Sequence, residues 1–359
     1  MRILHVVGAR PNFMKVSPVH RALAVHDGIT QLVVHTGQHY DERMSAVFFR
    51  ELGLPAPDVN LEVGSGTHAQ QTGQIMMRFE EVLTERRPDM VVVYGDVNST
   101  VAAALVCAKC QTPVAHVEAG LRSFDRDMPE EINRLVTDQL CDPLFTPSSD
   151  ANQNLAREGI PSGRIHFVGN VMIDTLTRLL PAAAQIGIVE TLGLTSRRYG
   201  LVTLHRPSNV DDAADLTAIV DALVDIAREL PLIFPVHPRT RAQLQRLAGA
   251  DGLQNVRLLD PVSYLEFLAL QQRATLVITD SGGIQEETTY LGVPCLILRD
   301  TTERPVVTEI GTAILVGRDP ERLRREASRI LSDGGRRGAI PPLWDGHAGE
   351  RIAVILAAQ

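Results

Sequence analysis

Apolar runs of strand length alternate along this chain with longer stretches in which apolar residues recur every three or four positions. In the first half, the strand-like runs are 3–7, 31–36, 90–95, 114–118 and 144–147. The helical stretches between them are 17–25, 41–52, 68–86, 98–110 and 129–141. Because strands that alternate with helices favour parallel βαβ units, this half predicts a doubly wound sheet.

The same alternation starts again in the second half. Its strand-like runs are 201–205, 232–236, 256–260, 276–280, 295–299 and 313–317. Its helical stretches are 212–230, 239–248, 263–272, 283–291 and 319–331. The pattern therefore predicts an α/β protein with two Rossmann-like, doubly wound domains, and a length of 359 residues fits two domains.

We expect the domain boundary near Gly169–Met172, after the segment HFVGN. We expect the first domain over residues 1–170 and the second over residues 171–345. The helical run within 346–359 is expected to join the first domain.

Composition and charge narrow the class of protein. Hydrophobic residues make up 44% and charged residues 22% of the chain, as in ordinary globular domains. The net charge of −8 argues against a general nucleic-acid binder. The chain shows neither a basic leader followed by an apolar run nor an apolar stretch of the ~18–20 residues that span a bilayer. We therefore expect a cytoplasmic protein with no membrane association.

Cysteine usage indicates neither a redox centre nor a metal site. Cys107 and Cys110 form a CxxC pair, but they lie late in a helical run, whereas reactive pairs sit where a helix begins. We interpret them as packing residues. The histidines and cysteines show no zinc-like spacing, so no metal is expected.

The candidate catalytic and binding residues of the first half lie directly after the predicted strands. Ligands of open parallel sheets bind outside the carboxyl ends of the strands, so these positions can form a site. Arg10 and Lys15 lie in a short segment after the first strand, where two cations can grip an anion. Asp96 follows the predicted strand 90–95 as the next helix opens, and a helix cap is the alternative interpretation. Glu118 ends an apolar strand, where a carboxylate must be paired or used.

Two adjacent glutamates follow Pro129 at the start of a predicted helix. Proline and acidic residues are typical of the first turn of a helix, which accounts for one of Glu130 and Glu131. The other glutamate is a candidate for the site.

In the second half, polar residues again follow the strands. His205 and Arg206 end one strand and His237 ends the next, and two histidines at corresponding positions favour a site over isolated structural roles. Ser281-Gly282-Gly283 lies between a strand and a helix, where glycines let the backbone approach a ligand and the helix N–H groups point at it. This pattern predicts a diphosphate cradle, with an ordinary glycine-rich turn as the alternative. Glu287 lies one helical turn further on, where its carboxylate could accept hydrogen bonds from ribose hydroxyls.

A second glycine-rich segment, Gly64–Ala69, matches GxGxxA but does not predict a dinucleotide site. The strand before it is too short, and the next strand starts near residue 90, too late for the usual acidic partner. No nicotinamide cofactor is expected.

Taken together, the motifs of the two halves resemble those of the non-hydrolysing UDP-N-acetylglucosamine 2-epimerases, in order and over nearly the whole chain. The matching segments are GARPNFMK (8–15), TGQHYD (36–41), YGDVNST (94–100), HVEAGLRS (116–123), MPEEINR (128–134), LHRPSN (204–209), PVHPR (235–239), TDSGGIQEE (279–287) and LRDTTERP (298–305).

The resemblance implies the GT-B architecture, in which a nucleotide-diphosphate sugar lies in the cleft between two Rossmann-like domains. It implies an isomerase that interconverts UDP-GlcNAc and UDP-ManNAc by eliminating UDP to 2-acetamidoglucal and adding it back. The family uses no cofactor and no metal, binds UDP as a product-like ligand, and is expected to form a homodimer. The implied acid/base residues are Asp96, Glu118, Glu130 and His205. The implied substrate-binding residues are Arg10, Lys15, Arg206, His237, Ser281, Gly282, Gly283, Glu287 and Arg304.

The sequence also departs from the commonest form of this family. Ala9 stands where a threonine is usual, and Pro207-Ser208 stands where Arg-Glu is common. Relatives that act on UDP-2,3-diacetamido uronic-acid sugars share the GARP opening, so the sugar stays open. Three further activities fit the same motifs less well: a hydrolysing epimerase that releases ManNAc and UDP, a glycosyltransferase of the same fold, and a non-catalytic UDP-sugar sensor.

Overall fold

A computed structural model describes residues 1–37, 51–236, 240–241, 243–244, 253 and 255–359 of the chain. By their contacts they form two compact units. Unit 1 comprises Met1–Thr175 together with Pro342–Gln359, and unit 2 comprises Leu176–Pro341. The division falls inside helix α7 (Val171–Gln185).

Unit 1 is built on a parallel sheet which, in the residues described, has seven strands in the order β3-β2-β1-β4-β5-β6-β7. The strands are β1 (Arg2–Val7), β2 (Thr30–His35), β3 (Val59–Asn60), β4 (Met90–Tyr94), β5 (Val114–Val117), β6 (Leu144–Thr146) and β7 (Ile165–Phe167). The central strands β4 and β5 are buried at every position, as expected where helices cover both faces of a parallel sheet.

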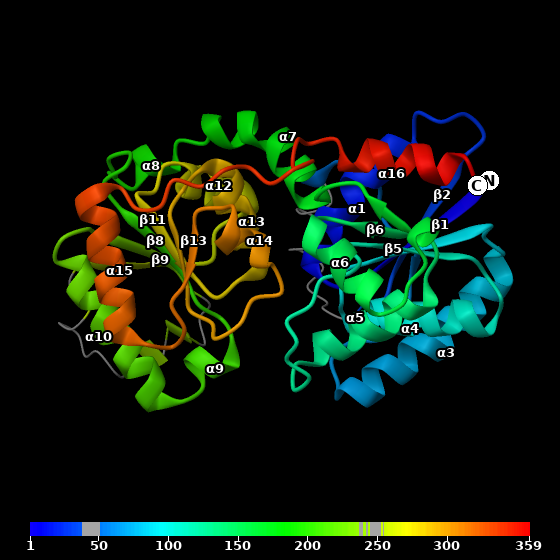
Figure 1. Cartoon of the computed structure of the whole chain (residues 1–359), viewed down its shortest axis with the longest axis horizontal. Helices are drawn as coiled ribbons and strands as arrows, with labels where there is room; N and C mark the ends of the chain where they lie inside the picture. The colour runs from blue at the N-terminus through cyan, green and yellow to red at the C-terminus, as the bar shows by residue number, and fades with distance from the viewer. Residues whose placement is uncertain (38–50, 237–239, 242, 245–252, 254) are drawn as a thin grey trace. The chain divides into compact units, whose positions relative to one another are not determined.

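The helices of unit 1 lie on the two faces of this sheet. Those in the described residues are α1 (Arg10–Leu23), α3 (His68–Arg86), α4 (Asn98–Lys109), α5 (Pro129–Leu140), α6 (Ser149–Arg157) and α16 (Ala348–Ala357). Figure 1 shows α3, α4 and α5 together on one side of the strands, with α1 and α16 on the other.

Unit 2 repeats the plan with a parallel sheet of six described strands in the order β10-β9-β8-β11-β12-β13. These are β8 (Gly200–Thr203), β9 (Leu232–Pro235), β10 (Val256–Leu259), β11 (Leu276–Thr279), β12 (Cys295–Ile297) and β13 (Ala313–Leu315). Its helices, where the chain is described, are α8 (Ile188–Thr191), α9 (Pro207–Val210), α10 (Ala213–Ala227), α12 (Tyr264–Gln272), α13 (Gly282–Leu291), α14 (Pro305–Glu309) and α15 (Pro320–Asp333). One apolar cluster lies between the sheet and helices α10 and α15, and a second lies on the opposite face under α8 and α12. The predicted fold class of two doubly wound α/β domains is confirmed.

Each sheet has a point where the strand order reverses direction. In unit 1 the chain goes from β1 outward to β2 and β3, then crosses to β4, and in unit 2 it goes from β8 outward and crosses to β11. Doubly wound sheets bind ligands outside the carboxyl ends of the strands at such a reversal. The residues that follow β1, β4, β8 and β11 are therefore the candidates for a binding site.

The structure differs from the predicted elements at the first motif. Residues 8–15 were expected to form a loop before a helix at residue 17, but α1 already begins at Arg10. The Asn12 side chain accepts hydrogen bonds from the backbone N–H groups of Gly8 and Ala9, and proline is tolerated in a first helical turn. Lys15 is consequently a helical residue whose side chain is turned inward.

Several elements were not predicted at all. Strands β3 and β7 have two and three residues, too short to show an alternating pattern. Helices α6, α7 and α8 fall in a segment to which no element was assigned. The predicted helices 41–52 and 239–248 lie largely outside the described residues.

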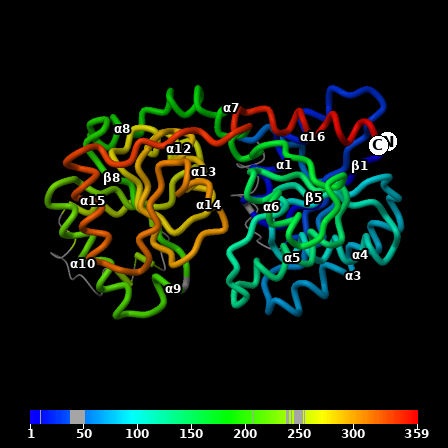
Figure 2. The backbone as a smooth tube through the Cα atoms, viewed as in Figure 1, coloured from blue at the N-terminus to red at the C-terminus, as the bar shows by residue number. Residues whose placement is uncertain are grey.

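The end of the chain belongs to unit 1, where α16 contacts α1. Figure 2 shows the red C-terminal segment running back onto the blue N-terminal part of the trace. The contact is close, because a Cβ on Gly349 would lie 2.8 Å from the carbonyl oxygen of Pro18. Asp174 accepts hydrogen bonds from the N–H groups of Ala348 and Gly349 at 3.1 and 2.7 Å and so caps α16. None of the helices that the structure describes combines the length and hydropathy of a transmembrane span.

Candidate functional site

Two carboxylates of unit 1 follow two neighbouring strands, the first of which lies at the reversal of the sheet. Asp96 follows β4 and Glu118 follows β5, and the two strands pair in register up to Tyr94 and Val117. Glu118 is buried and has a φ of 74°, a left-handed conformation that strains a non-glycine residue by about 1–2 kcal/mol. Its N–H and that of Ala119 both bond to the carbonyl of Phe145. Strain that is held in this way is typical of functional positions.

A buried lysine contacts one of these carboxylates. Lys15 Nζ donates to Glu118 Oε1 at 2.7 Å, and both side chains are almost fully buried. A Cβ on Gly95, whose φ is 64°, would lie 2.6 Å from Lys15 Nζ, so a larger residue in the turn after β4 would displace the lysine from Glu118. Lys15 was expected to face the substrate and its phosphates, and the structure places it against Glu118. Arg10 begins α1, but its side chain lies outside the part of the structure that is described.

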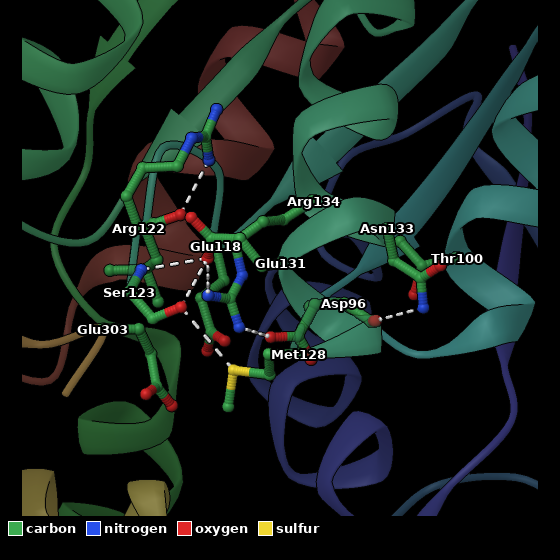
Figure 3. A network of polar contacts seen from close by, with 12 residues as sticks. Asp96, Thr100, Glu118, Arg122, Ser123, Met128, Glu131, Asn133, Arg134 and Glu303 are labelled. Atoms are coloured by element: carbon green, nitrogen blue, oxygen red, sulfur yellow. Dashed lines mark hydrogen bonds and ion pairs between the residues drawn. The ribbon is translucent and has the colours of Figure 1, made fainter. Parts of the chain in front are cut away.

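Arg134 links the second carboxylate to helix α5. Its guanidinium donates to Asp96 Oδ2 and to Glu131 Oε2, both at 2.5 Å. Figure 3 shows this arginine between the two acids, with dashed lines to each. Sequence analysis missed Arg134, although it ends the MPEEINR motif and lies on the buried face of an amphipathic helix.

The two glutamates that open α5 have different surroundings. Glu131 is buried and accepts hydrogen bonds from the N–H and hydroxyl of Ser123 and from the N–H of Phe124, at 2.9, 2.9 and 3.0 Å. It therefore fixes the segment before the helix. Glu130 is half-buried, and none of the described residues forms a hydrogen bond with its carboxylate. Of the pair, Glu131 has the structural role and Glu130 is available to a ligand.

A buried polar network, which sequence analysis also missed, supports the ends of β4 and β5. His116 bonds through Nδ1 to Asp138 Oδ1 and through Nε2 to the carbonyl oxygen of Gly95, both at 2.7 Å. Asp138 Oδ2 accepts from the N–H of Gly120 at 3.0 Å and lies 2.7 Å from Arg122 NH1. Burial alone would raise the pKa of Asp138, but the His116 ring and the Arg122 guanidinium outweigh it and hold the pKa below its usual value. The network ties the turn before Asp96 to the turn after Glu118.

In unit 2 the predicted anion cradle forms the start of α13. The helix begins at Gly282, with Ser281 as its N-cap, directly after β11. The first N–H groups of a helix have no partner within the helix, and they suit an anion. A Cβ on Gly282 would lie 2.8 Å from Arg304 NH1, so the guanidinium lies against the backbone here.

Two buried carboxylates hold Arg304 in this position. Its Nε lies 2.7 Å from Glu286 Oε1, and its NH1 donates to Glu303. The helix start and a fixed guanidinium together form a site that can hold a phosphate or diphosphate group.

The carboxylate expected to bind ribose is buried beside a tyrosine. Tyr264 Oη donates to Glu287 Oε1 at 2.8 Å, and Glu287 is almost fully buried. Burial, opposed by the Tyr264 hydrogen bond, raises the pKa of Glu287 to about 7.

His205 and Arg206 follow β8, where a buried aspartate contacts both. His205 Nδ1 lies 2.8 Å from Asp280 Oδ1, and the Arg206 N–H donates to Asp280 Oδ2 at 2.9 Å. Asp280 follows β11, the strand that pairs with β8. This aspartate lies within the TDSGGIQEE motif, whose pattern does not indicate its role. His237 lies outside the described residues.

The structure thus brings the predicted residues together in two groups, one in each unit. In unit 1, Lys15 contacts Glu118 and Arg134 contacts Asp96, with Glu130 on the same helix as Arg134. In unit 2, Ser281, Gly282 and Arg304 form the anion cradle. Among the described residues, no group of three or more histidine, cysteine, aspartate or glutamate side chains is arranged to hold a metal ion. The first group offers acid/base chemistry, and the second offers anion binding.

Comparison with known proteins shows which family the whole chain resembles. The family described as UDP-N-acetylglucosamine 2-epimerase matches residues 21–357. The UDP-N-acetylglucosamine 2-epimerase of Methanocaldococcus jannaschii is 44% identical over 364 residues, which cover 99% of each chain. The UDP-2,3-diacetamido-2,3-dideoxy-D-glucuronate 2-epimerase of Pseudomonas aeruginosa is also 44% identical, over 366 residues and 99% of each chain.

A solved structure shows the same fold. The crystal structure of the Methanocaldococcus jannaschii UDP-GlcNAc 2-epimerase in complex with UDP-GlcNAc and UDP matches with a TM-score of 0.91 at 44% sequence identity, covering 100% of both chains.

Proposed function

The chain belongs to the UDP-N-acetylglucosamine 2-epimerase family, and we propose that it is a non-hydrolysing epimerase that interconverts UDP-GlcNAc and UDP-ManNAc. The observation that carries this proposal is the pair of strand-end carboxylates in unit 1, Asp96 and Glu118, each held by its own cation. Inversion at carbon needs one group to remove a proton and another to supply one, and such a pair provides both.

The chemistry explains why the leaving group has to depart. The C2 proton of the sugar is not α to a carbonyl, so its direct removal is very unfavourable. When the C1–O bond breaks, the bonding electrons leave with UDP and positive charge develops on the ring. A base then takes the C2 proton, and the C2–H electrons form the C1=C2 double bond of 2-acetamidoglucal. Addition of UDP at C1 and of a proton to the opposite face of C2 completes the inversion.

We assign the proton transfers to the carboxylates of unit 1. Asp96, Glu118 and Glu130 are the acid/base groups, and each is worth roughly 10²–10⁴-fold in rate. Lys15 and Arg134 orient Glu118 and Asp96, because each donates a short hydrogen bond to its carboxylate.

We assign the diphosphate and the nucleoside to unit 2. The start of α13 and Arg304 stabilise the charge on the departing diphosphate, an electrostatic contribution that often exceeds that of acid/base groups. Arg206, at the end of β8, serves the same part of the substrate, and Glu287 accepts from the ribose hydroxyls. His205, also at the end of β8, is a fourth acid/base group, beside the bond that breaks.

A second candidate substrate is UDP-2,3-diacetamido-2,3-dideoxy-D-glucuronate. It is supported by the Pseudomonas aeruginosa relative, which is as similar to this chain as the Methanocaldococcus jannaschii enzyme. The two substrates share UDP and a 2-acetamido group and differ at C3 and C6, so the same chemistry serves both.

A product assay by proton NMR tests the proposal. Purified protein is incubated in parallel with UDP-GlcNAc and with the diacetamido uronate. We expect UDP-ManNAc to accumulate to a stable ratio with UDP-GlcNAc, with no free sugar. Release of ManNAc and UDP would show a hydrolysing enzyme instead, and turnover of the uronate alone would reassign the substrate. No turnover of either substrate would contradict the proposed function.

A further inference from the structure

A histidine and a buried aspartate are paired at the carboxyl ends of β8 and β11 in unit 2. His205 Nδ1 lies 2.8 Å from Asp280 Oδ1. The His205 side chain is 63% exposed, whereas that of Asp280 is 0% exposed. One end of the ring is therefore held by the protein, and the other end is accessible to a ligand.

The Asp280 carboxylate also accepts hydrogen bonds from other groups. It accepts from the N–H of His205 at 3.0 Å, from the N–H of Arg206 at 2.9 Å and from Asn209 Nδ2 at 3.0 Å. Burial alone would raise the pKa of Asp280, but these donors and the His205 ring outweigh it and hold the pKa below its usual value. Asp280 is consequently an anion at neutral pH.

The charge of Asp280 determines where the proton of a neutral His205 ring lies. An ionised carboxylate only accepts hydrogen bonds, so Nδ1 must be the nitrogen that carries the proton. The lone pair of the neutral ring is then on Nε2. None of the described residues forms a hydrogen bond with Nε2.

We propose that Asp280 is a positioning residue that holds His205 in the Nδ1–H tautomer and presents Nε2 to the substrate as a proton acceptor. This inference rests on the proposed function, in which His205 serves the reacting end of the nucleotide sugar. The same division of roles, with a buried carboxylate that fixes the tautomer of a histidine, is general in acid/base catalysis.

A purely structural role for Asp280 makes a different prediction. The carboxylate also fixes the turn after β8, because it accepts from two backbone N–H groups and from Asn209. If that were its whole function, substitution would reduce stability without changing the tautomer or the catalytic step. The test therefore needs a readout that the stability of the turn does not affect.

The Asp280→Asn variant provides this readout. Its remaining oxygen still accepts from the backbone, but its NH₂ group cannot accept the Nδ1 proton and instead favours the Nε2–H tautomer. We expect long-range ¹H–¹⁵N NMR of ¹⁵N-histidine protein at pH 8.5 to show Nδ1–H in the unsubstituted protein and Nε2–H in the variant. The His205→Gln variant assigns the signal. We expect kcat to fall by roughly 10²-fold or more, with KM and UDP affinity changed by less than about threefold.

Asn209→Ser is the matched control. Asn209 Nδ2 donates to Asp280 Oδ2 and to the carbonyl of Leu298, so its loss weakens the turn but leaves the contact between the ring and the carboxylate. We expect a lower Tm, an unchanged Nδ1–H tautomer, and a kcat within about threefold of the original.

Each outcome decides one of the two proposals. An Nε2–H tautomer in the unsubstituted protein overturns the inference, even if Asp280→Asn does not fold. An active, folded Asp280→Asn variant with unchanged kcat overturns it as well and leaves the epimerase assignment standing. If the unsubstituted protein turns over no UDP-sugar, the proposed function fails, and the tautomer measurement still decides the geometry.

Discussion

Glu118 is the residue whose conformation most needs an explanation. It is a non-glycine residue at a φ of 74°, buried, and bonded to a lysine that is buried as well. Placing two charged side chains in the interior and straining one backbone both lower stability, by amounts that apolar residues there would avoid. An arrangement of this kind is expected where a carboxylate has to stand at a fixed position for a reaction.

Replacing this carboxylate by its amide tests its assigned role. Glu118→Gln keeps the shape of the side chain and an oxygen that can accept from Lys15, but it cannot take up a proton at neutral pH. We expect kcat to fall roughly 10²–10⁴-fold, with UDP affinity within about threefold, by NMR turnover and calorimetric titration. Glu81→Gln, an exposed position on α3, is the control and should behave as the original protein does. Turnover near the original level in Glu118→Gln would remove Glu118 from the catalytic group.

Glu287 predicts a measurable pH dependence of stability. Its pKa is raised by burial from 4.5 to about 7, so the folded state holds the proton more tightly than the unfolded state does. This contribution to stability is fully present below pH 4.5 and is lost as the pH rises through about 7. In magnitude the loss is roughly 3 kcal/mol over that window.

The Glu287→Gln variant should lack this loss. Since all other groups titrate alike in both proteins, the stability of the variant relative to the original should rise between pH 5 and pH 8. Urea unfolding of both proteins at the two pH values measures the difference. Parallel changes in the two proteins would show that Glu287 is ionised at neutral pH despite its burial.

The residues of the candidate site were predictable from the sequence where a motif follows a strand. Asp96, Glu118 and Ser281–Gly283 were all found in this way, because the carboxyl ends of parallel strands meet at one edge of a sheet. Partners from distant parts of the chain were not predictable. Asp138 lies 22 residues from His116, and Asp280 lies 75 residues from His205, and no local pattern connects them.

At the scale of elements, the turn after β5 packs closely against helix α6. Gly120 has a φ of 83°, and a Cβ there would lie 2.5 Å from the carbonyl oxygen of Ala151 in α6. The turn therefore requires glycine for two separate reasons, conformation and space.

Two glycine substitutions separate these reasons. Gly120→Ala should lower the free energy of unfolding by about 3 kcal/mol, because left-handed strain and a backbone clash add. Gly159→Ala, at a φ of 82° with no atom within 4 Å of the added Cβ, should cost only about 1 kcal/mol. Denaturant unfolding of both variants measures the difference. Equal losses would show that α6 moves away at little cost.

The elements themselves were predictable to different degrees. The long apolar strands and the helices α3, α4 and α5 were found close to their observed bounds, because burial on both faces gives them strong patterns. The start of α1 was wrong by seven residues, since its cap comes from Asn12 inside the helix and its N-cap residue, Ala9, has no capping side chain. Helix α7 was missed in a segment without strand signals on either side.

For the whole molecule, the C-terminal segment makes the first unit discontinuous in sequence. Helix α16 buries Ile352, Ala353 and Leu356, and Trp344 donates through its indole nitrogen to the carbonyl of Pro147 at 2.9 Å. The last 18 residues are therefore part of the core of unit 1 rather than an appendage to unit 2.

Truncation of the chain tests this assignment. Ending the protein at His347 removes α16 and should destabilise unit 1 by about 5 kcal/mol, the value of burying two large aliphatic side chains and their neighbours. Scanning calorimetry should show one transition moved to lower temperature and a second, from unit 2, little changed. Removing only Ala358 and Gln359, which are exposed, is the control and should leave both transitions in place. A shift confined to the transition of unit 2 would contradict the assignment.

Transfer of deuterium from solvent to C2 of the sugar tests the elimination route most directly. The protein is incubated with UDP-GlcNAc in deuterated water, and the nucleotide sugars are analysed by NMR and mass spectrometry. Because the C2 proton passes to a carboxylate and is replaced from solvent, we predict UDP-ManNAc that carries deuterium at C2. UDP-ManNAc that retains the original proton at C2 would contradict removal of that proton by an exchangeable group of the protein.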